Sequence, residues 1–128
     1  MRRARLACST LLLIAAALAG CGDVKPGKEI DAAPSCPATD AETGTWHSNP
    51  WMQDGCPWME YPSKTALVVP HDLGRQPDVV LPYISFDSEG RDATLGSGDV
   101  ARILDTSDVT VTVGNATEQK LFLRLVLR

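Results

Sequence analysis

The end of the chain alternates strictly between two kinds of side chain. Leucine occupies every second position from 121 to 127, and the intervening positions hold Phe122, Arg124 and Val126. Successive side chains of a strand point to opposite faces of a sheet, so this period of two predicts a strand with one leucine face and one mixed face. Valines at 109, 111 and 113 alternate with threonines and predict a second half-buried strand.

Other apolar segments in the second half of the chain are short and rich in β-branched residues. We expect strands at 65–70, 78–87 and 99–104. Pro82 has no backbone N–H, which indicates an edge or a bulge in the second of these strands. Turn residues recur at roughly ten-residue intervals, and no window has helical periodicity. The pattern predicts an all-β fold, either a small antiparallel β-sandwich or a small barrel, and we expect the sandwich.

The start of the chain has a different pattern. Arg2, Arg3 and Arg5 precede an apolar run of 15 residues at 6–20. A membrane-spanning helix needs roughly 20 apolar residues, and the chain turns polar directly after the run. A basic start, a short apolar run and small residues at its end are typical of a secretory signal peptide, so we expect a signal peptide at 1–20.

The run ends in Leu18-Ala19-Gly20-Cys21, which resembles the lipobox of bacterial lipoproteins at all four positions. The resemblance implies cleavage before Cys21, a diacylglycerol on its thiol and a fatty acyl group such as palmitate on the new amino end. A cleaved signal peptide without a lipid is the alternative. Gly22 follows the cysteine, which by analogy with enteric lipoproteins favours the outer membrane. We therefore expect a cell-envelope protein held to a membrane by its lipid.

Beyond residue 21 the chain is small and acidic. The 107 residues that remain suit one domain, and they hold nine basic and all sixteen acidic residues, a net charge of −7. An acidic chain without a basic cluster argues against nucleic acid and against anionic lipid headgroups as partners. We expect residues 21–45, interrupted by three prolines, to be a lipidated tether, and residues 46–128 to be the sandwich domain.

Two cysteines remain in the expected domain once Cys8 and Cys21 are set aside. An exported chain meets an oxidising compartment, so Cys36 and Cys56 are expected to form a disulfide. A metal site is the alternative, but two cysteines without a second pair nearby are too few for zinc. We expect no metal and no cofactor.

The segment at 46–62 concentrates aromatic side chains among turn residues. Trp46, Trp51, Trp58 and Tyr61 are four of the seven aromatic residues of the chain. We expect an irregular segment, and two interpretations are open. The indoles either form a small core that covers the disulfide, or they form an exposed platform on which the apolar faces of sugar rings stack.

His71 lies in the loop between the expected strands at 65–70 and 78–87. The stretch from Val69 to Pro77 looks like modules at the ends of phage tail fibres, and 108–125, with its Val-Thr-Val-x-Asn-x-Thr core, is similar to the H-type lectin sandwich. These resemblances imply a non-enzymatic, antiparallel binding module that often forms trimers or hexamers. The resemblance gives no position-by-position match to the sugar-contacting residues of the lectins, so none of those roles is carried over to this chain.

Catalysis has little support in the sequence. His71 and Asp72 are neighbours on one loop, which rarely gives the spatial arrangement of a catalytic triad, and the chain has no Gly-x-Ser-x-Gly motif. His71 is expected to donate a hydrogen bond to the backbone of a turn. Acidic residues around Gly90 could hold calcium, but they lack the spacing of a calcium loop, and we expect a solvated hairpin tip.

We therefore expect a lipid-anchored envelope protein with a β-sandwich that binds carbohydrate or another envelope protein. The expected contact residues are Trp46, Trp51, Trp58 and His71. The alternative is a structural lipoprotein that assembles with copies of itself and takes no small ligand. We do not expect an enzyme.

Overall fold

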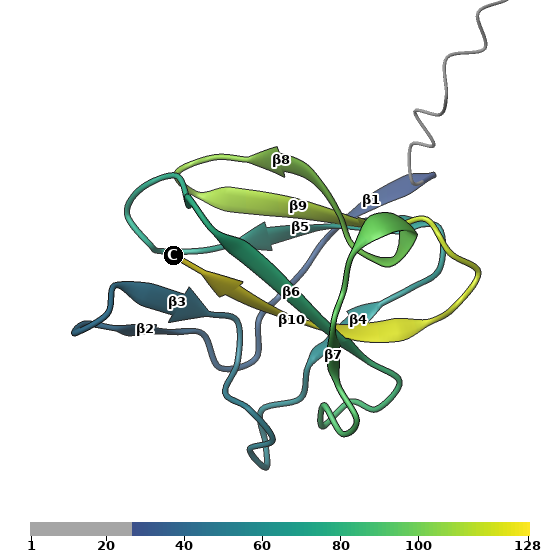
Figure 1. Ribbon diagram of the computed structural model, residues 1–128, viewed down its shortest axis with the longest axis horizontal. Coiled ribbons are helices and arrows are strands. Elements are labelled where there is room, and N and C mark those ends of the chain that lie inside the picture. Colours follow the sequence, from purple (N-terminus) through teal and green to yellow (C-terminus); the bar gives the residue numbers. More distant parts are fainter. Residues whose placement is uncertain (1–26) are drawn as a thin grey trace, which may run out of the picture.

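The computed structural model describes residues 27–128 and shows two β-sheets packed face to face as a sandwich (Figure 1). The expected signal peptide and Cys21 lie outside the described residues. The strands are β1 (Lys28–Asp31), β2 (Ala38–Asp40), β3 (Thr45–His47), β4 (Met59–Tyr61), β5 (Thr65–Pro70), β6 (Val80–Ser85), β7 (Thr94–Leu95), β8 (Arg102–Thr106), β9 (Thr110–Asn115) and β10 (Leu121–Leu127). The all-β sandwich predicted from the alternating pattern is confirmed.

One sheet has the strand order β1-β5-β9-β8. Strand β5 pairs antiparallel with β9 along its whole length, from Thr65 opposite Asn115 to Pro70 opposite Thr110. Strand β1 runs parallel to β5, which is the one departure from antiparallel pairing among the described strands. Strands β2, β3 and β4 lie between β1 and β5 in sequence, and this long connection lets the chain return in the same direction.

The other sheet is organised around β10. Strand β6 pairs with one side of β10 over six positions, while β4 and β3 share its other side, β4 at Leu121–Leu123 and β3 at Val126–Leu127. Strand β2 extends this sheet beyond β3, and β7 extends it beyond β6. Strand β10 is therefore covered on both edges.

The core lies between the two sheets and follows the predicted pattern. All four leucines of β10 are buried, whereas Phe122, Arg124 and Val126 on the opposite face are only partly buried. The leucines pack into one cluster with the inward-facing residues of β5 and β9, among them Leu67, Val69, Val111 and Val113.

The expected strands at 65–70 and 121–127 are confirmed with the same bounds, and the one at 78–87 is shorter at both ends. The carbonyl of Pro82 accepts a hydrogen bond from Gly96 N at 2.7 Å, so its nitrogen also faces the β7 side. Strand β7 pairs there with Tyr83 and Ile84 but not with Pro82, which leaves the missing N–H without consequence. The segment 99–104 begins as a short 3-10 turn at Gly98–Val100, and β8 starts only at Arg102.

The expectation of a tether through residue 45 is wrong for residues 28–31 and 38–40. These residues form β1 and β2, and Ile30 of β1 packs against the core. Strand β1 is four residues long and has charged residues on both sides of Ile30, so its sequence shows no alternation of apolar and polar positions. Pairing with the edge of β5 stabilises it. In the described part of the chain, no helix is long and apolar enough to cross a membrane.

Candidate functional site

The tryptophans do not form a common platform. Trp46 and Trp58 are 0% and 2% exposed, whereas Trp51 is 44% exposed. The rings form two separate groups: Trp46 packs edge-on against His71 at 6.0 Å between centroids, and Trp51 packs edge-on against Trp58 at 5.5 Å. The platform interpretation is therefore wrong for Trp46 and Trp58. Trp46 belongs to the core between the two sheets and not to a separate small core.

Trp58 is held in place by the turn between β6 and β7. Its backbone N–H donates to the carbonyl of Ser88 at 2.8 Å, and its indole lies directly against Gly90. Gly90 has a φ of 79°, and a Cβ built on it would lie 2.3 Å from two carbon atoms of the Trp58 ring. Glycine is required here both for backbone conformation and for space.

Gly90→Ala is expected to destabilise the domain more than Gly74→Ala does. Gly74 has a φ of 81° and open space where its Cβ would be, so the two substitutions share the backbone strain and differ in the clash with Trp58. Overpacking costs about 1–3 kcal/mol, which is the expected difference in unfolding free energy between the variants. Urea denaturation of both variants measures it, and equal losses would contradict the packing of Trp58 on Gly90.

The exposed Trp51 lies on the outer face of the sheet that contains β10. Arg124 of β10 is opposite Tyr83 of β6, and Tyr83 is opposite Leu95 of β7, so these three residues form a row across the sheet. The Trp51 ring packs edge-on against Tyr83 at 5.2 Å. We call Trp51, Tyr83, Leu95 and Arg124 the Trp51 patch.

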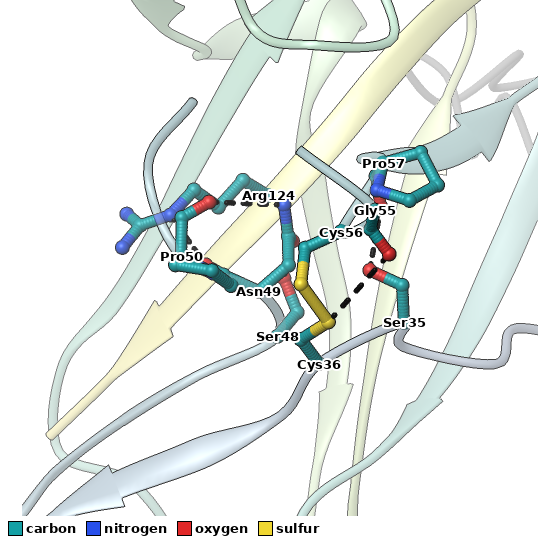
Figure 2. The surroundings of a disulfide bond; sticks show 9 residues. All are labelled: Ser35, Cys36, Ser48, Asn49, Pro50, Gly55, Cys56, Pro57 and Arg124. Atoms are coloured by element: carbon teal, nitrogen blue, oxygen red, sulfur yellow. Dashed lines mark hydrogen bonds between the residues drawn. A yellow bond between two sulfur atoms is a disulfide. The ribbon is translucent and has the colours of Figure 1, made fainter. Parts of the chain in front are cut away.

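Arg124 occupies the centre of the Trp51 patch. Its guanidinium carbon lies 5.2 Å from the centroid of the Trp51 ring and 5.9 Å from that of Tyr83. Its Nε–H donates to the carbonyl of Asn49 at 2.8 Å, and Figure 2 shows the two terminal nitrogens pointing away from the disulfide. The stacked, half-buried guanidinium combines cation–π attraction with free hydrogen-bond donors.

The electrostatic setting of Arg124 is unusual. Within residues 27–128, no carboxylate lies within 4.0 Å of its nitrogens. Partial burial lowers the pKa of Arg124, and the neighbouring Tyr83 opposes that shift. His47 of β3 lies opposite Val126 of β10. Burial and the positive charge of Arg124 both lower the pKa of His47.

The loop that carries Trp51 is fixed at both ends. Cys36 and Cys56 form the expected disulfide, with an S–S distance of 2.01 Å. At the other end, Ser48 N donates to the carbonyl of Leu125 at 3.0 Å, and the Leu125 N–H donates back to the Ser48 hydroxyl at 3.0 Å. Figure 2 shows Ser48, Asn49 and Arg124 next to this disulfide. The loop that carries Trp51 is therefore held by one disulfide and by hydrogen bonds to β10.

His71 belongs to a different part of the surface. Its Nε2 donates to the carbonyl of Ser107 at 3.1 Å, and its Nδ1 accepts from the Leu73 N–H at 3.2 Å. The expected hydrogen bond from His71 to the backbone is confirmed. With Trp46 and three prolines, His71 lines a shallow hollow of about 270 Å³, which is apart from the aromatic contacts of Trp51.

Two residues central to the structure were not anticipated as such. The alternating pattern predicts Arg124 on the mixed face of the last strand but not its contacts with Trp51 and Tyr83. Asn115 ends β9 fully buried, where its Nδ2 donates to the carbonyls of Pro62 at 3.0 Å and Gln119 at 2.8 Å. Its amide joins β9 to the loops that follow β4 and β9.

The acidic residues near Gly90 form a turn. Gly90 N donates to the carbonyl of Asp87 at 3.0 Å, and Arg91 pairs with Glu89 at 2.7 Å. Over the residues that the structure describes, no group of three or more His, Cys, Asp or Glu side chains is arranged to hold a metal ion. Comparisons with protein-family models, with curated proteins and with solved structures found no match to this chain.

Proposed function

We propose that this chain is a lipid-anchored envelope protein whose sandwich binds carbohydrate at the Trp51 patch. The observation that carries the proposal is the half-buried guanidinium of Arg124 beside the rings of Trp51 and Tyr83 on an outer sheet face. An exposed indole offers a flat apolar surface to the C–H face of a sugar, and a fixed guanidinium offers donors to its oxygens.

The arrangement of the chain supports a surface role. Six residues separate Cys21 from Lys28 at the start of β1, so these two residues are at most about 25 Å apart when the chain between them is fully extended. A lipid on Cys21 would therefore keep the sandwich close to the membrane. In Figure 1 the β3–β4 and β6–β7 loops lie at the lower edge of the view, away from the start of β1 at the upper right. The β3–β4 loop, which carries Trp51, therefore lies apart from the start of β1 (Figure 1).

Trp51→Ala tests the binding role. We expect it to weaken carbohydrate binding by at least about tenfold, equivalent to about 1.4 kcal/mol, because it removes the exposed ring. Leu104→Ala is the matched control, since Leu104 is 43% exposed but lies on β8 of the other sheet. A glycan array probed with the full chain, followed by titration of any bound glycan, gives the measurement. No binding to any glycan, or equal binding by both variants, would exclude this function.

Cys21→Ser tests the anchor. We expect the variant to leave the membrane fraction, because serine has no thiol to take the diacylglycerol and the acyl chains that hold the protein to the bilayer are lost. Cys8→Ser is the control and should stay with the membrane, since Cys8 precedes the cleavage site. Mass spectrometry of the native amino end should find a lipid-modified Cys21. An unmodified amino end would remove the anchor from the proposal.

A second candidate function is self-assembly into an envelope structure. It is favoured by β8, an edge strand on which Ile103 and Leu104 are both exposed. An exposed apolar edge strand is a template for pairing with a second chain. Light scattering of the full chain in detergent separates the two functions, because a monomer that binds a glycan supports the first and a ligand-independent oligomer supports the second.

A further inference from the structure

The position of Arg124 identifies a class of carbohydrate, if the proposed function holds. We propose that the ligand of the Trp51 patch is an acidic sugar, a glycan with uronic-acid residues, whose carboxylate is bound by the two terminal nitrogens of Arg124. The inference rests on the proposed function and adds the chemical group that is recognised.

The first step is the geometry of the guanidinium. The hydrogen bond from Nε to the Asn49 carbonyl uses one edge of the group, and the rings of Trp51 and Tyr83 lie against it. The terminal nitrogens point away from this scaffold (Figure 2). Two parallel N–H groups on a rigid plane match the two oxygens of a carboxylate, and such bidentate pairs are among the strongest hydrogen-bonded contacts in proteins.

The second step is the missing counter-charge. Five basic side chains within residues 27–128 have a carboxylate partner within 4.0 Å, as in Lys120–Glu60 at 3.4 Å, and the unpaired Lys28 and Arg128 are exposed to solvent. Arg124 has none within residues 27–128, although it is half-buried. A partly desolvated charge without a partner is costly, and an anionic ligand would supply the partner. The downward shift of the Arg124 pKa by burial agrees with this cost.

The third step distinguishes carboxylate from phosphate. Arg124 is the single cation in the Trp51 patch, and the nearby Lys120 is already paired with Glu60. The chain beyond residue 21 is acidic, so it repels dianions more strongly than monoanions. One guanidinium in such surroundings matches the single charge of a carboxylate better than the double charge of a phosphate. The exposed part of Trp51 beside it provides the surface on which the sugar ring stacks.

Trigalacturonate and its methyl ester test the inference, because they share one sugar backbone and differ in charge. Isothermal titration of the full chain in detergent should show the acid binding at least about tenfold more tightly than the ester. Arg124→Gln should reduce this ratio to about one, while Arg75→Gln, at an exposed arginine paired with Asp78, should leave it unchanged. A melting curve of each variant confirms that it is folded. Inorganic phosphate should fail to displace the acid.

The outcomes separate the two proposals. Equal binding of acid and ester that is lost in Trp51→Ala would overturn the acidic-sugar inference and leave carbohydrate binding in place. Displacement of bound trigalacturonate by an equal concentration of inorganic phosphate would also overturn the inference, because the patch would then bind any oxyanion. Binding of neither sugar, together with an empty glycan array, would overturn the proposed function itself.

Discussion

Leu123→Asp is expected to unfold the domain. Leu123 is fully buried at the middle of β10, where it belongs to the core cluster and faces the other sheet. Removing the leucine side chain costs about 2–5 kcal/mol. An unpaired carboxylate in the same place adds several kcal/mol more for lost hydration. Together these losses are comparable to the whole net stability of a small domain, about 5–15 kcal/mol.

Circular dichroism and urea denaturation of the full chain measure the result. The variant should lack a cooperative unfolding transition at 25 °C. Val109→Asp is the control, because Val109 is an exposed apolar residue directly before β9, and the unfolding free energy of this variant should be close to that of the wild type. A cooperatively folded Leu123→Asp protein would contradict the assignment of the leucine face to the core.

Removing the disulfide should have the second largest effect on stability. Cys36 and Cys56 are 20 positions apart, and closing a loop of that length restricts the unfolded chain by about 3 kcal/mol. For a domain of about 100 residues this lowers the melting temperature by about 10–25 °C. The double variant Cys36→Ser/Cys56→Ser should show this decrease in a thermal melt.

We expect the double variant to bind carbohydrate more weakly than the wild type, even where it still folds. The bond joins the segment after β1 to the β3–β4 loop that carries Trp51. A freer loop must be ordered on binding, which lowers affinity. Reduction of the wild-type protein with dithiothreitol is the control and should reproduce the melting temperature of the double variant. An unchanged melting temperature in both cases would show that the hydrogen bonds of Ser48 and Asn49 hold this region without the disulfide.

The Trp51 patch shows how one strand serves two purposes. The same alternation that buries the leucines of β10 places Arg124 on the opposite face, and the pairing with β6 places Tyr83 beside it. The core therefore fixes the register that aligns Arg124 with Tyr83, because a slip by one residue would move arginine into the core. The stability of the domain and the proposed carbohydrate binding therefore depend on opposite faces of the same strand.

The alternating leucines and valines were enough to determine the all-β fold, the position of β10 and which of its faces is buried. The sequence was also enough to predict the disulfide, because Cys36 and Cys56 are the only two cysteines left once Cys8 and Cys21 are assigned to the expected signal peptide and lipid anchor. These features depend on period and composition, which are local properties of the chain.

The tertiary structure alone decided the rest. Strand β1 has no periodic signal, and only the free edge of β5 makes it a strand. The neighbours of each tryptophan ring decide whether it is buried or exposed. Trp46 is buried in the core beside His71, and Trp58 is buried against Gly90. Trp51 lies on the outer face of the sheet and stays exposed. Arg124 became part of a site only because β6 and the β3–β4 loop bring Tyr83 and Trp51 to it. Such contacts join residues far apart in sequence, so no local pattern of hydrophobic and polar positions contains them.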